Sequence, residues 1–381
     1  DVYKRQPQRF KEALKRRVMV MDGAMGTMLQ VSGLRPGGCP EELNISRPAT
    51  IREIHRAYAE AGADIIETNT FGGNRIKLRE YGLEKKTGEL NKAAVKIAKE
   101  AVGKRTYVAG CIGPTGKLFE PLGELGFDEA VTVFREQALA LLKGGADIFS
   151  IETMMDLSEV KAAVIAVREV TDKPIMAMMT FEQSLRTVMG TPPESAAVVL
   201  EGLGVDVIGT NCGLGAKGVY EVLKRMSLVT SRPLISEANA GIPVLKNGVS
   251  VFPSSPQDHI QFLSESIALG VRVMGGCCGT GPDHIRAVAK AIRSAGIDLK
   301  GLRRLNKLPG PKAPQQMKLA SRTTWLFLGP PAPVAVIGER INPTGKKEYQ
   351  AELREGKTTY IQEQAQSQQQ AGAVALDINV G

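Results

Sequence analysis

The chain is poor in cysteine, histidine and aromatic side chains. Its 381 residues include five cysteines, three histidines and 5% aromatic residues. So few cysteines cannot form the disulfide framework of a secreted protein, and we therefore expect a reducing compartment, the cytoplasm. No apolar run reaches the roughly 18 residues that a membrane helix needs, and no secretory signal pattern opens the chain, so we expect no membrane partner.

The charge balance is basic, with a net charge of +9 and a pI of about 9.2. Much of the excess lies in two segments, residues 9–17 and residues 300–312. Aromatic side chains that stack on bases are scarce throughout the chain. We therefore interpret the basic residues as a solvated surface and expect no nucleic-acid partner.

Two of the five cysteines are adjacent, in the stretch "VRVMGGCCGTGP" (residues 271–282). Neighbouring cysteines rarely bridge to each other, because disulfide geometry fits poorly across a single trans peptide. The glycines on both sides leave room for the two sulfurs to approach something small. The alternative is that both cysteines are small apolar residues buried at a strand end.

Short apolar segments recur along the chain, each followed by a helical pattern, and such runs are typical of parallel strands buried on both faces. The eight segments are residues 18–22, 63–70, 106–111, 146–153, 174–181, 205–212, 233–240 and 271–278. Helical patterns follow, for example at residues 48–62, 127–145 and 281–296. This alternation predicts a (β/α)8 TIM barrel over residues 9–296, with a doubly wound open sheet as the alternative. No glycine-rich dinucleotide motif follows the first strand, which favours the barrel.

The ends of the chain depart from this alternation. Residues 1–8, "DVYKRQPQ", are expected to be a non-native or disordered start. Residues 297–333 are rich in proline and glycine and predict a linker. The pattern resumes with a strand at 334–342, a helix at 358–372 and a strand at 374–381. We expect residues 334–381 to be the truncated start of a second α/β barrel.

In a (β/α)8 barrel, functional groups gather at the C-terminal ends of the strands. Cys212 ends the sixth predicted strand, and Cys277 and Cys278 end the eighth. These strands flank the seventh, so the three sulfurs can converge at that face. Three thiolates with one open position are typical of a reactive zinc site. Cys111 is expected to be a packed cysteine and Cys39 a free surface thiol.

Six motifs at successive strand ends resemble the homocysteine S-methyltransferase family. They are "DGAMGTML" (22–29), "ETNTFGGN" (67–74), "IETMMD" (151–156), "TNCGLG" (210–215), "EANAGIP" (237–243) and "GGCCGTGP" (275–282). The resemblance covers roughly residues 10–296 and implies a methyltransferase that activates homocysteine as a thiolate on zinc, with no catalytic residue beyond the zinc ligands. The substrate-binding residues that we expect are Asp22, Gly23, Ala24, Met25, Glu152 and Asn239.

Residues 338–347 and 376–381 resemble, more briefly, the start of a pterin-binding barrel. Its candidate contacts are Glu339, Asn342, Asp377 and Asn379. A homocysteine barrel followed by a pterin barrel implies a reaction in which methyltetrahydrofolate and methylcobalamin act through domains absent from this chain.

Two alternatives remain open for the barrel. Related zinc barrels take the methyl group directly from betaine or S-methylmethionine. A non-catalytic zinc module that docks a corrinoid protein is the alternative of another class.

Overall fold

The computed structural model describes residues 2–35, 37–103, 106–246, 249–295 and 316–380. These residues form two compact units. The first contains the described residues up to 295 together with residues 320–325, and the second contains residues 316–319 and 326–380.

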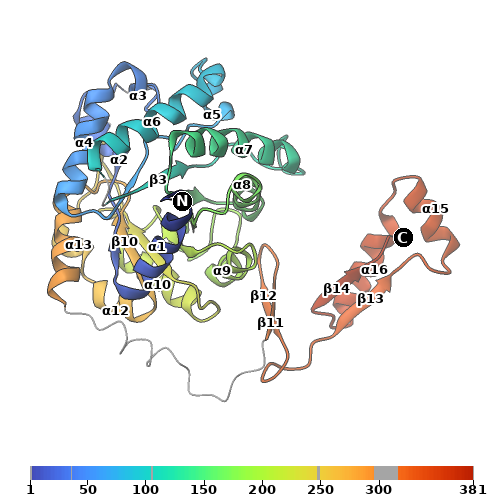
Figure 1. Cartoon of the computed structure of the whole chain (residues 1–381). Helices are drawn as coiled ribbons and strands as arrows, with labels where there is room; N and C mark the ends of the chain where they lie inside the picture. The colour runs from blue at the N-terminus through green and yellow to red at the C-terminus, as the bar shows by residue number, and fades with distance from the viewer. Residues whose placement is uncertain (1, 36, 104–105, 247–248, 296–315, 381) are drawn as a thin grey trace. The chain divides into compact units, whose positions relative to one another are not determined.

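The first unit is built on an eight-stranded sheet in which every neighbouring pair of strands is parallel (Figure 1). The strand order is β1-β10-β7-β6-β5-β4-β3-β2, and a parallel bridge between Met21 and Ile65 joins its two ends. The sheet therefore closes into a barrel, as predicted. Its strands are β1 (Met19–Val20), β2 (Ile65–Glu67), β3 (Tyr107–Ile112), β4 (Ile148–Met154), β5 (Ile175–Met179), β6 (Val207–Asn211), β7 (Leu234–Ala238) and β10 (Val271–Gly276).

Helices surround this barrel on the outside (Figure 1). The predicted helix at residues 48–62 is α4, which has Pro48 in its first turn and the left-handed Gly62, with φ 109°, just past its end. The helices are α2 (Met25–Val31), α3 (Leu43–Ser46), α4 (Pro48–Ala61), α5 (Arg75–Arg79), η1 (Glu84–Lys86), α6 (Thr87–Val102), α7 (Phe127–Gly144), α8 (Leu157–Val170), α9 (Pro193–Gly202), α10 (Ala216–Ser227), α11 (Pro256–His259), α12 (Leu263–Ala268) and α13 (Pro282–Ser294).

A helix before the first strand, α1 (Val2–Arg16), covers the N-terminal end of the barrel. Phe10 and Leu14 of this helix belong to the core cluster that fills the barrel interior, and the Phe10 ring meets the Tyr107 ring edge-on at 5.4 Å between centroids. The helix begins at Val2 and so includes residues 2–8. That residues 1–8 are a non-native or disordered start stays a prediction.

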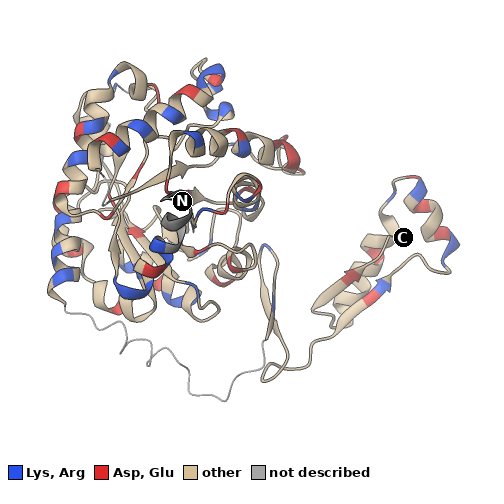
Figure 2. Ribbon diagram, viewed as in Figure 1, with Lys and Arg blue, Asp and Glu red and all other residues tan. Residues whose placement is uncertain are grey.

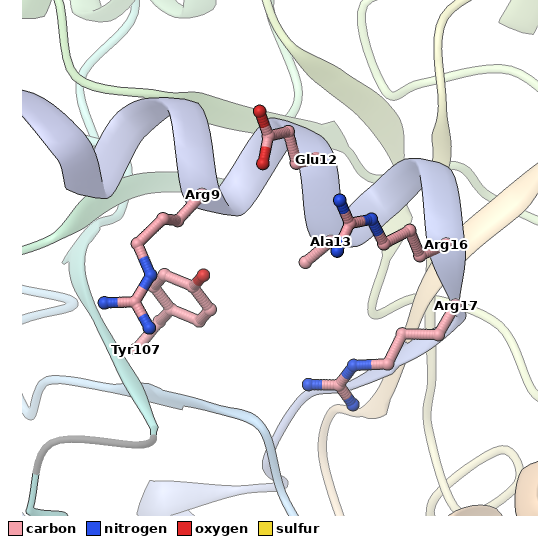
Figure 3. Close-up of a pocket in the computed structure, with 6 residues that line it drawn as sticks. All are labelled: Arg9, Glu12, Ala13, Arg16, Arg17 and Tyr107. Carbon is pink, nitrogen blue, oxygen red and sulfur yellow. The ribbon is translucent and has the colours of Figure 1, made fainter.

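The polar face of α1 borders a cavity of about 290 Å³ at the same end of the barrel (Figure 3). Arg9, Arg16 and Arg17 line it together with Tyr107. Arg17 donates to Asp64 at 2.7 Å, just before β2. These contacts anchor α1 at the barrel end opposite to the C-terminal ends of the strands.

Two strand pairs lie in segments where we expected none. β8 (Val244–Lys246) and β9 (Val249–Val251) form an antiparallel pair after β7. β11 (Met317–Ala320) and β12 (Trp325–Leu328) pair within the expected linker, whose residues 297–315 lie outside the described residues. This strand pair, which includes the apolar run "WLFL", was not anticipated, and the linker over residues 297–333 stays a prediction.

The second unit also contains a parallel pair, β13 (Ile337–Ile341) and β14 (Ala375–Ile378). Two helices connect them, α15 (Lys347–Arg354) and α16 (Thr359–Gln370). The predicted strand, helix and strand are confirmed, while α15 was not anticipated. That these elements begin a second barrel stays a prediction.

Charges of both signs are interspersed on the outer helices (Figure 2). Within the described ranges, no helix combines the length and the hydrophobicity that crossing a bilayer requires.

We predict that Phe10→Ala destabilises the barrel by about 3–5 kcal/mol, because a fully buried ring would leave a cavity in the core. Urea unfolding followed by circular dichroism measures this change in the free energy of unfolding. Arg9→Ala, on the exposed side of the same helix, is the control and should stay within about 0.5 kcal/mol of the unsubstituted chain. Equal effects of the two substitutions would contradict the role given to Phe10.

Candidate metal and substrate site

Three cysteine sulfurs converge at the C-terminal ends of two strands. Cys212 directly follows β6, and Cys277 and Cys278 directly follow β10. The Sγ atoms of Cys212 and Cys278 are 3.8 Å apart, and all three sulfurs lie within 4.8 Å of one another. All three residues are half-buried, so the cluster remains accessible to a small ligand. The structure thus brings the three predicted metal ligands together.

The backbone around the cysteines directs their sulfurs toward one point. Cys212 has φ 59°, in the left-handed region that non-glycine residues rarely occupy. After Cys277 the chain turns back, because the Thr280 N–H donates to the Cys277 carbonyl at 3.1 Å. Gly279 in this turn has φ 82°, and a Cβ there would lie 2.3 Å from Phe252. Only glycine fits this position.

The donor set fits a zinc ion. Zinc binds thiolates at about 2.3 Å with tetrahedral angles, which separates two of its sulfur ligands by about 3.8 Å. The distance between Cys212 and Cys278 matches this separation. Three protein ligands leave the fourth tetrahedral position to an exchangeable ligand, whereas structural zinc sites use four protein ligands.

Hydrogen bonds within the cluster decide which sulfur carries a proton. Bonds from Cys277 and Cys278 lower the pKa of Cys212 to about 3. The bonds with Cys212 raise the pKa of Cys278 to about 12 and raise the pKa of Cys277 well above its usual value. The neighbouring sulfurs therefore favour loss of a proton at Cys212. A metal ion that displaces the remaining protons would gain further thiolate ligands.

Four carboxylic acids lie at or near the ends of strands on the same face of the barrel. Asp22 after β1, Glu152 in β4 and Glu237 in β7 are buried, and Glu67 in β2 is half-buried with its Oε1 buried. Loss of hydration on burial is the main cause that raises the pKa of each, and repulsion from neighbouring carboxylates raises the pKa of Asp22, Glu67 and Glu237 further. A cation placed among these acids would relieve both costs.

Glu152 is the most heavily hydrogen-bonded of these acids. The Cys111 thiol donates to Glu152 Oε1 at 2.9 Å, and the Asn211 amide donates to Glu152 Oε2 at 2.8 Å. Cys111 is buried, as expected, but it has a specific partner. Burial and the charges of Glu152 and Glu67 raise the pKa of Cys111 well above its usual value. Its sulfur lies beside Glu67 and Glu152 and is not one of the three that converge.

The loop after β1 supplies only part of the predicted carboxylate contact. The Ala24 N–H donates to the Thr280 carbonyl at 3.1 Å, so this amide already has a partner. The Tyr58 hydroxyl lies 3.0 Å from the carbonyls of both Ala24 and Thr280 and fixes the loop. Of the three predicted amides, those of Gly23 and Met25 remain candidates for a substrate carboxylate.

Asn239 faces the cysteine cluster. Its side chain hydrogen-bonds to Cys212 and helps to lower the pKa of that thiol. Its Oδ1 is buried and has no hydrogen-bond partner among the residues that the structure describes. The Asn239 side chain therefore donates a hydrogen bond to Cys212, and its Oδ1 is left to accept one from a bound substrate.

Sequence reasoning missed three residues of this site, Glu67, Asn211 and Glu237. Asn211 and Glu237 are buried and Glu67 is half-buried; all three end or nearly end their strands and lie in motifs singled out above. Strand-end position was thus the available signal, but it does not tell whether a side chain points into the barrel.

The prediction for Cys39 is wrong. Its exposed fraction is 8%, and it packs against Leu78 and Leu90 because the loop before α3 folds back onto α5 and α6. Its thiol donates to Glu41 at 3.3 Å, and burial with the nearby Glu41 charge raises its pKa to about 12. Cys39 is a packed thiol with no part in the metal site.

The four candidate pterin contacts lie on the second unit. Asn342 Nδ2 donates to Glu339 Oε1 at 2.9 Å, and the Asn379 N–H donates to the Ile341 carbonyl at 2.8 Å. Asn342 and Asn379 thus lie just past the ends of β13 and β14, while Glu339 and Asp377 are exposed residues within these strands. Their role in pterin binding stays a prediction.

We predict that Glu67→Gln becomes more stable, relative to the unsubstituted chain, as the pH rises. The raised pKa of Glu67 means that the folded chain keeps a proton that the unfolded chain has released, so the free energy of unfolding falls with pH. Glutamine mimics the protonated acid and has no proton to lose. Urea unfolding at pH 6 and pH 8 should show the difference growing by up to about 1.4 kcal/mol per pH unit.

Glu60→Gln is the matched control for this test, because Glu60 is an exposed carboxylate on α4. It should change the free energy of unfolding by the same amount at both pH values. If Glu67→Gln also changes the free energy of unfolding by the same amount at pH 6 and pH 8, Glu67 is ionised in the folded chain and the prediction fails.

Comparison with known proteins agrees with this geometry. The sequence profile of the homocysteine S-methyltransferase family matches residues 19–292. The chain is 35% identical to methionine synthase of Mycobacterium leprae over 389 aligned residues, which cover 97% of this chain and 32% of that protein. The methionine synthase of Mycobacterium tuberculosis is also 35% identical, with the same coverage. The chain thus spans about a third of the length of these relatives.

A solved structure shares the barrel. The homocysteine methyltransferase MmuM from Escherichia coli, in its metallated form, is 25% identical and superposes with a TM-score of 0.62 over 72% of this chain and 96% of that protein. The matched region contains the three cysteines, the four acids and all eight strands. The chain therefore belongs to the homocysteine S-methyltransferase family.

Proposed function

We propose that this chain holds a zinc ion through Cys212, Cys277 and Cys278 and uses it to activate homocysteine for methyl transfer, giving methionine. The convergence of three half-buried sulfurs at the barrel face that also carries four carboxylic acids, three of them buried, supports this proposal most strongly. The sulfurs suit the metal and the substrate thiol, and the acids suit an ammonium group. Homocysteine carries both groups.

Zinc bound by three thiolates, with one position free, lowers the pKa of a thiol that takes this position and keeps its sulfur nucleophilic. The free thiol has a pKa near about 8.5 and is mostly protonated at pH 7. The activated sulfur then forms a bond to the methyl carbon while the bond between that carbon and its donor breaks. No general base is needed for this step, and the buried acids are not assigned one.

The amino-acid end of homocysteine is bound by the chain's own residues. Asp22 and Glu152 accept hydrogen bonds from the ammonium group and ionise as it arrives, because its charge offsets the cost of their burial. The Gly23 and Met25 amides are left for the carboxylate. Asn239 Oδ1 offers one further acceptor beside Cys212.

The methyl donor reaches this site from the barrel mouth. Large apolar side chains are exposed on the successive loops that follow β2, β3, β4 and β5, namely Phe71, Leu118, Leu122, Met155 and Val188. An apolar rim around a polar site suits a partner that covers it during transfer. We assign this partner to a cobalamin-carrying domain outside this chain that receives its methyl group from methyltetrahydrofolate, because the two relatives at 35% identity are named methionine synthase.

In this scheme the second unit belongs to the folate side of the reaction. Glu339, Asn342, Asp377 and Asn379 would contribute to a pterin site that this chain holds only in part. The position of Asn342 and Asn379 just past two paired strands, with Glu339 hydrogen-bonded to Asn342, supports the assignment.

Direct transfer from betaine or S-methylmethionine is the second candidate. The observation that favours it is the likeness to MmuM, in which the shared barrel makes up 96% of the protein. A barrel of this kind therefore serves as a homocysteine methyltransferase with little additional chain.

We predict that the purified chain binds about one zinc ion and that Cys212→Ser, Cys277→Ser and Cys278→Ser each lose it, because serine is a poor zinc ligand. Metal analysis of the purified variants measures this. Cys39→Ser and Cys111→Ser, which remove buried thiols outside the cluster, are the controls and should keep their zinc. Full zinc content in Cys212→Ser would refute the ligand assignment.

We predict that the zinc-loaded chain forms methionine from homocysteine and free methylcobalamin, slowly, because a free donor is not held in line with the sulfur. Methyltetrahydrofolate alone should give no product, and Cys277→Ser should be inactive. Product analysis with each donor measures this. Rapid turnover with betaine or S-methylmethionine, and none with methylcobalamin, would favour the second candidate. A chain that binds zinc but not homocysteine would instead be a non-catalytic docking module.

A further inference from the structure

One buried amide connects the acidic part of the site with the cysteine cluster. Asn211 is the last residue of β6, is fully buried, and precedes Cys212. Its Nδ2 lies 2.8 Å from Glu152 Oε2, 2.8 Å from Thr153 Oγ1 and 3.7 Å from Cys277 Sγ. Its Oδ1 accepts the Thr153 N–H at 2.8 Å. Asn211 therefore touches both parts of the site at once.

The backbone at Thr153 depends on this amide. Thr153 has φ 58°, which is unfavourable for a β-branched residue, and the β4–β5 register shifts between Ile151 and Met154. Such an irregularity changes the direction of the neighbouring side chain. The bond from the Thr153 N–H to Asn211 Oδ1 holds this conformation and with it the position of Glu152.

Only an amide satisfies all these partners. The backbone N–H of Thr153 requires an acceptor, whereas Glu152 requires a donor. The asparagine side chain offers a donor and an acceptor at the same distance from the backbone. Aspartate would instead place an oxygen against the Glu152 carboxylate. The orientation of the amide is thus fixed from two sides.

We propose that Asn211 is a positioning residue that sets the distance between Glu152 and the metal site, and so selects homocysteine over cysteine. This inference rests on the proposed function. Cysteine has one methylene group fewer than homocysteine. If Glu152 and the metal site are held at a fixed distance, cysteine therefore cannot place its ammonium group at Glu152 and its sulfur at the metal at the same time. One methylene group typically discriminates about 10- to 200-fold. If Asn211 is removed, Glu152 can shift toward the shorter substrate.

The test compares the affinities of zinc-loaded protein for homocysteine and cysteine by calorimetric titration. Unsubstituted chain should prefer homocysteine by at least about tenfold. Asn211→Ala and Asn211→Asp should keep their zinc, bind homocysteine more weakly and lose most of this preference. Asn91→Ala is the matched control, because Asn91 is equally buried and donates to the Gly73 and Thr87 carbonyls, outside the site.

The outcomes separate this inference from the function on which it rests. A preference unchanged in both Asn211 variants with zinc retained would overturn the inference alone. Loss of zinc in both variants would also overturn it, because Asn211 would then build the metal site and not its spacing. Unsubstituted, zinc-loaded protein that binds neither thiol would overturn the proposed function, and the inference with it.

Discussion

The concentration of acidic groups at one end of the barrel is the constraint on which the rest of the site depends. Parallel strands bring their C-terminal ends to one face, and here these ends carry four carboxylic acids, three of them buried, and three cysteines. Such a set cannot ionise fully without cations, because burial and mutual repulsion oppose it. Protons balance part of this charge, as the raised pKa values of Glu67 and Glu237 indicate. A metal ion and an ammonium group are the natural replacements for these protons.

The strained backbone of the site and the packed core that stabilises it lie at opposite ends of the same barrel. Two non-glycine residues of the site, Thr153 and Cys212, have left-handed backbones. Such conformations persist only where the surroundings hold them. The support comes from the interior core and from Phe10 and Leu14 of α1 at the other end, which keep the strands in register. The barrel can thus tolerate an irregular face because the opposite face is well packed.

The sequence predicted the barrel and the convergence of the three cysteines, but not the environment around them. Apolar runs mark strands reliably, and a cysteine at a strand end can be assigned to one face of a barrel. Whether Glu67 or Asn211 points inward depends on local twist and register, such as the shift in β4, which no residue pattern encodes. Cys39 was misassigned because its burial depends on contacts with residues about 40 to 50 positions away, Leu78 and Leu90.

The two ends of the proposed substrate also restrict how methyl transfer can proceed. The ammonium group would be held by fully buried acids, whereas the cysteines are only half-buried. The substrate sulfur would therefore lie on the accessible side of the site, and the methyl group must arrive from the mouth. Because the apolar rim extends over at least four successive loops, a donor domain covering it would exclude water from the sulfur. The chain would then contribute to catalysis by holding the substrate sulfur as a nucleophile at a fixed distance from the ammonium site. The donor domain would bring the methyl group to this sulfur.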